Sequence, residues 1–98
     1  MREITVQELH ADPNVPVVDV RELDEWQAGR VPRAEHMPMA QVPVRYPEIP
    51  DGAAIICASG GRSARVVEYL EQSLGIVTMN VTGGTNAWLE AGYPADRG

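Results

Sequence analysis

The sequence predicts one α/β domain, residues 1–98, built on a parallel β-sheet. Short runs of apolar residues alternate with amphipathic stretches along the chain, a pattern typical of βαβ units. The apolar runs lack the polar alternation of half-exposed strands, which indicates strands that are covered on both faces. The chain has 98 residues and no internal repeat, so it can build one hydrophobic core and has little material for a second.

The first half of the chain predicts three short strands and two short helices. Pro13 and Pro16 bracket a turn, because a helix does not continue through the residue before a proline. Gly29 ends the second predicted helix. Arg21 and Glu25 stand four residues apart, a spacing at which they can form an ion pair. The predicted strands are residues 4–5, 17–20 and 34–37, and the predicted helices are residues 6–10 and 22–28.

The second half predicts a proline-rich connection followed by a strand, a long helix, a strand and a short helix. Four prolines lie between residues 38 and 52, so this segment is expected to be ordered but neither a regular helix nor a central strand throughout. Residues 53–57 are an apolar run that predicts a central strand buried on both faces. The apolar positions of residues 63–74 repeat at helical spacing, and Gly75 is the expected end of that helix. The last strand is predicted at residues 77–81, and the last helix follows residues 82–85 and ends at Gly92.

The composition excludes several classes of function. Fourteen acidic residues against eight arginines give a net charge of −6, which disfavours nucleic acid and anionic membranes as partners. The chain has no lysine, so neither Schiff-base chemistry nor a P-loop is possible. One cysteine and two histidines cannot form an internal disulfide or supply a structural zinc site. No apolar run is long enough to span a membrane and no secretory signal is evident, so we expect a cytoplasmic protein.

Cys57 stands at the carboxyl end of the predicted central strand, where a short loop leads into the longest predicted helix. By residue type alone, such a cysteine is more often an inert core residue. The loop that follows is small and glycine-rich, so backbone N–H groups and the positive end of the helix are expected to surround the thiol. These surroundings stabilise an anion and predict a lowered thiol pKa and a nucleophilic thiolate. Ligands of open α/β sheets bind at this edge, which favours a functional site.

Gly60 and Gly61 are expected to let consecutive amides converge on the thiol, because glycine has no Cβ and tolerates a positive φ. An ordinary strand-to-helix turn would explain the same two glycines without any ligand. The loop residues expected to bind substrate through their amides or side chains are Ala58, Ser59, Gly60, Gly61, Arg62 and Ser63.

At these residues the sequence resembles the rhodanese family in its single-domain form, and the resemblance covers nearly the whole chain. The matching segments, in family order, are Asp19-Val20-Arg21-Glu22, Glu25-Trp26, Gly29-Arg30-Val31-Pro32, His36-Met37-Pro38, Cys57-Ala58-Ser59-Gly60-Gly61-Arg62-Ser63, Val81-Thr82-Gly83-Gly84, Trp88 and Gly92-Tyr93-Pro94. The resemblance implies a rhodanese-like fold, with a central five-stranded parallel sheet, helices on both faces and the Cys57 strand near the centre.

The activity that the resemblance implies is sulfur transfer through a persulfide on Cys57. The donor would be a small molecule such as thiosulfate or a protein persulfide, and the acceptor would be cyanide or a thiol. The outer sulfur of a persulfide is an anion that backbone amides can hold, so no metal and no organic cofactor is required. Because the chain has no second cysteine, sulfur must be released to an external acceptor. The sequence leaves open whether the protein is a monomer or a homodimer.

Several residues are expected to support the loop. Asp19 and Arg21 are expected to form a charged brace beside it, and Gly83 and Gly84 to form a turn packed against it. Arg62 has two interpretations that the sequence leaves open, since it can attract the bound anion or pair with an acidic residue to brace the loop.

Two alternatives to sulfur transfer remain. The first is a rhodanese-like module that binds a partner or senses persulfides without catalysis, although inactive members often lose the cysteine. The second, phosphatase or arsenate reductase chemistry, is disfavoured because those relatives have five residues between cysteine and arginine, whereas four separate Cys57 from Arg62. Ala58 departs from the family pattern, in which many members have a basic residue there, and this predicts a modest affinity for thiosulfate.

Overall fold

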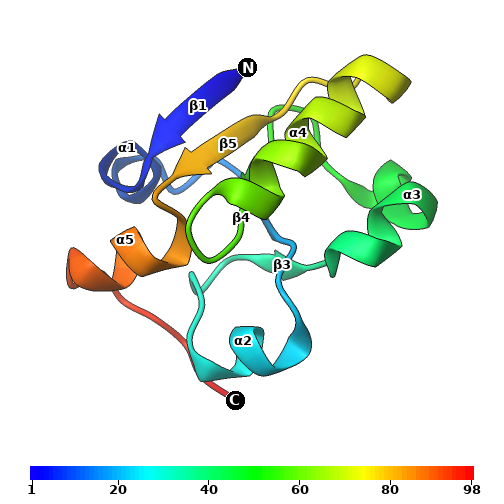
Figure 1. Ribbon diagram of the computed structural model, residues 1–98. Coiled ribbons are helices and arrows are strands. Elements are labelled where there is room, and N and C mark those ends of the chain that lie inside the picture. The colour runs from blue at the N-terminus through cyan, green and yellow to red at the C-terminus, as the bar shows by residue number, and fades with distance from the viewer.

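The computed structural model describes residues 1–98 and is organised around a five-stranded sheet (Figure 1). All neighbouring strands are parallel, and their order is β1-β5-β4-β2-β3. The strands are β1 (Arg2–Thr5), β2 (Val17–Asp19), β3 (Glu35–His36), β4 (Ala54–Ile56) and β5 (Met79–Thr82). The predicted five-stranded parallel sheet is confirmed, and β4 is its middle strand.

Helices cover both faces of the sheet, as expected. They are α1 (Val6–Ala11), α2 (Leu23–Ala28), α3 (Val42–Arg45), α4 (Gly61–Leu74) and α5 (Gly84–Glu90). Because successive side chains of a strand point to opposite faces, the neighbours Ile55 and Ile56 belong to two different hydrophobic clusters. Ile55 packs in the cluster that contains Leu70 of α4, whereas Ile56 packs in the cluster that contains Leu9 of α1 and Trp88 of α5. Each fully buried side chain of this size contributes about 1.5–3 kcal/mol to the free energy of folding.

The predicted elements are all present, with shifted boundaries where backbone geometry decides. Helix α4 begins at Gly61, two residues before the predicted start, because Gly60 is its N-cap with a left-handed φ of +112°. Gly75 ends the helix as predicted, with a φ of +67°. Strand β5 was predicted from residue 77 and begins at Met79, because its pairing with β1 and β4 begins at Met79. Val77 lies outside the sheet with 40% of its surface exposed.

The connection between β3 and β4 is ordered, as its prolines predicted, and it contains helical turns. Two 3-10 turns, Met39–Gln41 and Tyr46–Glu48, flank α3. Pro43 and Pro47 are the second residues of α3 and of the second 3-10 turn, and a missing N–H is tolerated in the first turn of a helix. Val42 of this connection packs in the same cluster as Ile55, so the segment covers part of one sheet face.

Parallel strands place their carboxyl ends at one edge of the sheet. The segments that leave β2, β4 and β5 there are those that contain Asp19, Cys57 and Gly83. The topology therefore brings together residues that are far apart in the sequence. None of the helices has both the length and the apolar composition required to cross a bilayer.

Candidate active site

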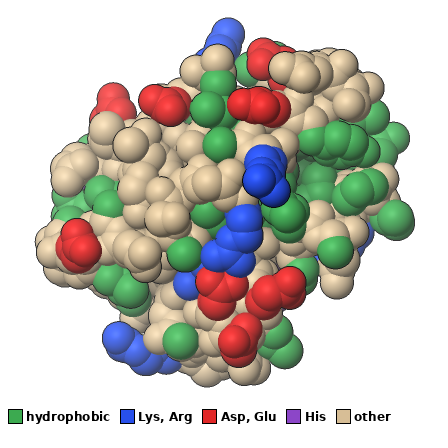
Figure 2. Space-filling view, in the orientation of Figure 1, with side chains coloured by type: hydrophobic (Ala, Val, Ile, Leu, Met, Phe, Trp, Pro, Cys, Tyr) green, Lys and Arg blue, Asp and Glu red, His purple; other side chains and the backbone are tan.

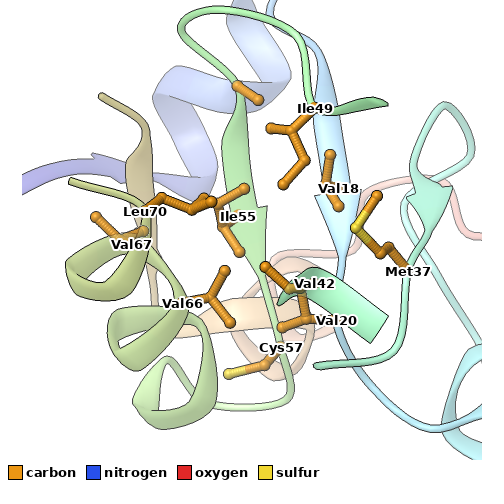
Figure 3. Packing of buried hydrophobic residues seen from close by; sticks show 11 residues of the cluster. Val18, Val20, Met37, Val42, Ile49, Ile55, Cys57, Val66, Val67 and Leu70 are labelled. Carbon is orange, nitrogen blue, oxygen red and sulfur yellow. The ribbon is translucent and has the colours of Figure 1, made fainter. Parts of the chain in front are cut away.

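Cys57 directly follows β4, and its side chain lies between the loop and the core. Only 1% of the residue surface is exposed. The side chain belongs to the hydrophobic cluster that also contains Val20, Val42 and Val66, and its sulfur points toward the loop at the start of α4 (Figure 3). The thiol is therefore shielded from solvent by apolar side chains on one side and by the loop on the other.

Three hydrogen-bonding groups surround the sulfur on the loop side. The backbone N–H of Gly60 donates to Sγ at 3.1 Å and that of Ser63 at 3.3 Å, and the Ser63 hydroxyl lies 3.2 Å from Sγ. Two of the six amides from Ala58 to Ser63 thus make the contact that the sequence predicted for the loop as a whole. The donors are neutral dipoles, which stabilise negative charge on sulfur without forming an ion pair.

These contacts lower the pKa of the Cys57 thiol. Burial alone would raise the pKa, because it disfavours the charged form. The hydroxyl of Ser63 and the backbone N–H groups of Ser63, Gly60 and Ser59 act in the opposite direction and together outweigh burial. The fold therefore favours a thiolate at a position where an apolar environment alone would favour a thiol.

The two loop glycines have different roles. Gly60 needs its left-handed φ of +112°, which turns the chain so that its own N–H faces the sulfur. Gly61 has an ordinary negative φ, and a Cβ added there would meet no atom within 4 Å. Of the two glycines, only Gly60 uses the tolerance of a positive φ, and Gly61 is the first residue of α4.

Asn80 holds the loop from strand β5, and the sequence analysis missed it. Its Oδ1 accepts a hydrogen bond of 2.5 Å from the Ser63 hydroxyl, and its Nδ2 donates to the Gly60 carbonyl at 3.2 Å. The only signal in the sequence is a polar residue inside the apolar run of a buried strand, where it needs partners. The Ser63 hydroxyl has a single proton, so it donates either to Asn80 or to the sulfur.

The turn Gly83-Gly84 packs against the start of the loop. A Cβ on Gly84 would lie 2.6 Å from the carbonyl oxygens of both Cys57 and Ala58, and the φ of Gly84 is +58°. The first amides of α5 donate to the same two carbonyls, Thr85 N–H to Cys57 O at 2.9 Å and Asn86 N–H to Ala58 O at 3.0 Å. Helix α5 thus fixes the carbonyl side of the loop while the amide side faces the sulfur.

Asp19 and Arg21 form a buried ion pair beside the loop. The Asp19 residue is fully buried, and its carboxylate accepts from Nε and Nη2 of Arg21 at 2.8 to 3.1 Å. The same guanidinium donates to the carbonyls of Glu25 and Gly29 at the end of α2. Arg21 therefore binds the backbone of Glu25 and not its carboxylate, because Arg21 precedes α2 and the four-residue spacing rule applies within a helix.

The carboxylate of Glu25 instead binds Arg62 across 37 positions of sequence. Nη1 and Nη2 of Arg62 donate to Oε1 and Oε2 at 2.7 and 2.8 Å, a bidentate pair that is about one third exposed. Mainly through the hydrogen bonds to Arg62, the pKa of Glu25 falls to about 2, and the pKa of Arg62 is raised in turn. Of the two interpretations of Arg62, its side chain adopts the bracing one in this structure.

No group of three or more histidine, cysteine or acidic side chains is arranged to hold a metal ion. A hollow of about 250 Å³ lies beside the loop, between α2 and α5, and is lined by Arg21, Glu25, Ala58 and Asn86 among others. A second hollow of about 160 Å³ lies between α3 and α4, where Val42 and Val66 also contact the cluster that contains Cys57. Two hollows thus border residues that adjoin Cys57 in the sequence or in its cluster, although Cys57 itself lines neither of them.

Known proteins are similar to this chain in sequence and in fold. The rhodanese-like domain family matches residues 4–91. A protein of Allochromatium vinosum named sulfurtransferase is 37% identical over 91 residues, which cover 90% of this chain and 84% of that protein. The crystal structure of a rhodanese-related protein from Thermoplasma volcanium superposes with a TM-score of 0.90 at 34% identity and 97% coverage of both chains. A rhodanese-like domain protein from Staphylococcus aureus gives a TM-score of 0.82 at 40% identity, covering 90% of this chain and 91% of that one. The chain belongs to the rhodanese family.

Proposed function

We propose that the protein is a sulfurtransferase in which Cys57 is the nucleophile and the carrier of a persulfide. The observation on which this depends is the sulfur of Cys57 held by the N–H groups of Gly60 and Ser63 and by the Ser63 hydroxyl. These donors favour a thiolate and suit the negative outer sulfur of a persulfide. A relative named sulfurtransferase supports the same class of reaction.

Sulfur transfer through Cys57 needs only the donor, the acceptor and the Cys57 thiolate. The Cys57 thiolate attacks the outer sulfur of thiosulfate, a new S–S bond forms, and the original S–S bond breaks with its electron pair leaving on sulfite. An acceptor such as cyanide then attacks the outer sulfur of the persulfide and leaves as thiocyanate, which restores the thiolate. A thiol acceptor leaves as a new persulfide. The lone cysteine dictates two half-reactions separated by product release.

Burial of the thiol sets a condition on the first half-reaction. With 1% of Cys57 exposed, a donor sulfur can approach Sγ only when part of the covering loop or of the apolar wall moves aside. Val42 belongs to the short helix α3 at the molecular surface, whereas Gly60 is fixed by Asn80. The apolar wall at α3 is therefore the side that we expect to open.

The bidentate pair of Arg62 and Glu25 argues against phosphatase chemistry. An enzyme that grips a tetrahedral oxyanion between loop amides and an arginine needs that guanidinium free to bind it. Here both terminal nitrogens of Arg62 already bind a carboxylate. The loop is also one residue shorter than in those relatives.

Intact mass spectrometry tests the proposal. Incubation with thiosulfate is expected to add the mass of one sulfur atom, which cyanide removes. The Cys57→Ser variant keeps the size of the side chain and is expected to show no added mass and no thiocyanate formation. If the wild-type protein remains unmodified with thiosulfate and with persulfide donors, the protein is a rhodanese-like interaction module and the proposal is wrong.

A further inference from the structure

The two basic side chains that flank the loop, Arg21 and Arg62, are both paired with acidic ones, whereas Arg65 of α4 is exposed, lines the hollow between α3 and α4 and has no ion pair. Arg62, the only basic residue of the loop, has both terminal nitrogens on Glu25. Arg21 has Nε and Nη2 on Asp19. Ala58, the residue next to the nucleophile, has no charge. Figure 2 shows basic and acidic side chains adjoining one another in the middle of the face that contains the start of α4.

The sulfur therefore sits among neutral donors and apolar side chains. The groups that bind Sγ are amides and a hydroxyl, and the cluster behind it contains Val20, Val42 and Val66. These groups can stabilise one negative charge on the transferred sulfur. They offer nothing for a second negative charge elsewhere on a donor, for which a free guanidinium would be required.

Glu25 determines whether such a guanidinium is free. Its carboxylate lies on α2, outside the loop, and makes no contact with the sulfur. Apart from the amide of Glu22, which donates to Oε1 at 3.2 Å, its only hydrogen-bonded partner is Arg62. The side chain of Arg62 in turn has no other hydrogen bond in the structure, so neutralising Glu25 would release its guanidinium beside the loop.

We infer that Glu25 sets the choice of sulfur donor: by holding Arg62 it makes the site prefer donors with one negative charge over dianionic thiosulfate. The inference rests on the proposed function and deepens it, since it names monoanionic persulfides and thiosulfonates as the donor class. Glu25 acts through Arg62 and is a positioning residue that touches neither the donor nor the reacting sulfur.

Two donors of matched chemistry test the inference. Thiosulfate and methanethiosulfonate both deliver a terminal sulfur from a sulfonyl centre, with sulfite or methanesulfinate leaving, but they differ by one negative charge. The measurement is the ratio of kcat/KM for thiosulfate to kcat/KM for methanethiosulfonate, in which differences of intrinsic reactivity cancel between variants. Glu25→Gln is expected to raise this ratio by roughly threefold to tenfold, because the released guanidinium interacts with the extra charge. Most of the change should appear in KM for thiosulfate.

Three variants separate this effect from simpler ones. Asp24→Asn removes the same charge from an exposed position of α2, so it is expected to leave the ratio unchanged. Arg62→Gln leaves the Glu25 carboxylate without its cation and is expected to lower the ratio, whereas the double variant Glu25→Gln, Arg62→Gln removes both charges and should keep the wild-type ratio. Thermal unfolding confirms that each variant is folded.

The inference is overturned if Glu25→Gln leaves the ratio as it is in wild type, or if Asp24→Asn raises it equally. A fall of the ratio in the double variant also overturns it, since Arg62 would then serve the dianion while bound to Glu25. This last measurement decides the matter even if Glu25→Gln does not fold. If the wild-type protein takes sulfur from neither donor, the proposed function itself fails, which is a distinct result.

Discussion

The carboxyl ends of β2 and β4 each present a buried acidic group, the Asp19 carboxyl and the Cys57 thiol, and the two groups are held in opposite ways. At the end of β2, the Asp19 carboxylate is neutralised by the guanidinium of Arg21. After β4, the Cys57 sulfur is held by the amides of Gly60 and Ser63 and by a hydroxyl, with no cation bonded to it. An ion pair neutralises the Asp19 carboxylate, whereas the neutral donors lower the pKa of the Cys57 thiol without pairing the sulfur with a cation. The difference shows how one sheet edge can contain both a structural brace and a reactive group.

Breaking the ion pair is expected to have the largest effect on stability. Arg21→Met removes the cation and leaves the fully buried Asp19 carboxylate uncompensated, so the free energy of unfolding should fall by about 3–5 kcal/mol. Urea unfolding at neutral pH measures the change. Asp19→Asn added to Arg21→Met should restore part of the loss, and a single variant as stable as the wild type would contradict the role of the pair.

Disturbing the support of the Cys57 loop is expected to cost less. Gly84→Ala places a Cβ 2.6 Å from two loop carbonyls at a φ of +58°, so it should lower the free energy of unfolding by roughly 1–3 kcal/mol and impair persulfide formation. Gly61→Ala is the matched control, because its Cβ meets no atom within 4 Å and its φ is negative. The control should be neutral or slightly stabilising, and equal losses in the two variants would refute the packing argument.

Removing one neutral donor should weaken the thiolate. In Ser63→Ala the hydroxyl contact to Sγ is lost, so the pKa of the Cys57 thiol should rise. The rate of persulfide formation at neutral pH should then fall by about threefold to tenfold, since one hydrogen bond of this kind contributes on the order of 1 kcal/mol. The deficit should shrink as the pH rises through the pKa of the variant, when both proteins become thiolates. A pH-independent deficit would instead indicate a defect in positioning.

Adding a cation to the loop beside Cys57 is expected to have the smallest effect on catalysis. Ala58→Arg introduces an unpaired guanidinium beside the nucleophile, and the KM for thiosulfate is expected to fall by a few-fold while kcat changes little. Steady-state kinetics at low and at high ionic strength measures this, because the gain should diminish with added salt. An unchanged KM would show that affinity for the dianion is limited by something other than charge.

The local features of the site follow from the sequence, whereas its long-range pairs do not. The apolar run of residues 53–57, the glycine at position 60 and the helical spacing of residues 63–74 are short-range patterns, and they predict a strand, a loop and a helix in the right order. The bond of Arg62 to Glu25 depends on which residues the tertiary fold brings together. The spacing instead suggested Arg21 as the partner of Glu25, and this was wrong because Arg21 lies before the helix begins.

The burial of Cys57 also depends on tertiary packing. The sequence predicts a loop around the sulfur, but no pattern in it predicts that Val20, Val42 and Val66 cover the sulfur on the side away from the loop. Asn80 is a similar case, since a single polar residue in a strand indicates a partner without saying which one. The expectation that Gly83-Gly84 packs against the loop came from the resemblance to a family, and the structure places Gly84 in direct contact with the loop carbonyls.

The hydroxyl of Ser63 has one proton and two acceptors within reach, Sγ of Cys57 and Oδ1 of Asn80. An ionised sulfur can only accept, so ionisation should draw the proton toward Sγ and away from Asn80, and protonation of the sulfur should reverse the change. The side-chain amide resonances of Asn80 should therefore shift as the sulfur gains or loses charge. Nuclear magnetic resonance of the Asn80 side chain would then report the charge state of the Cys57 sulfur, to which Asn80 makes no bond.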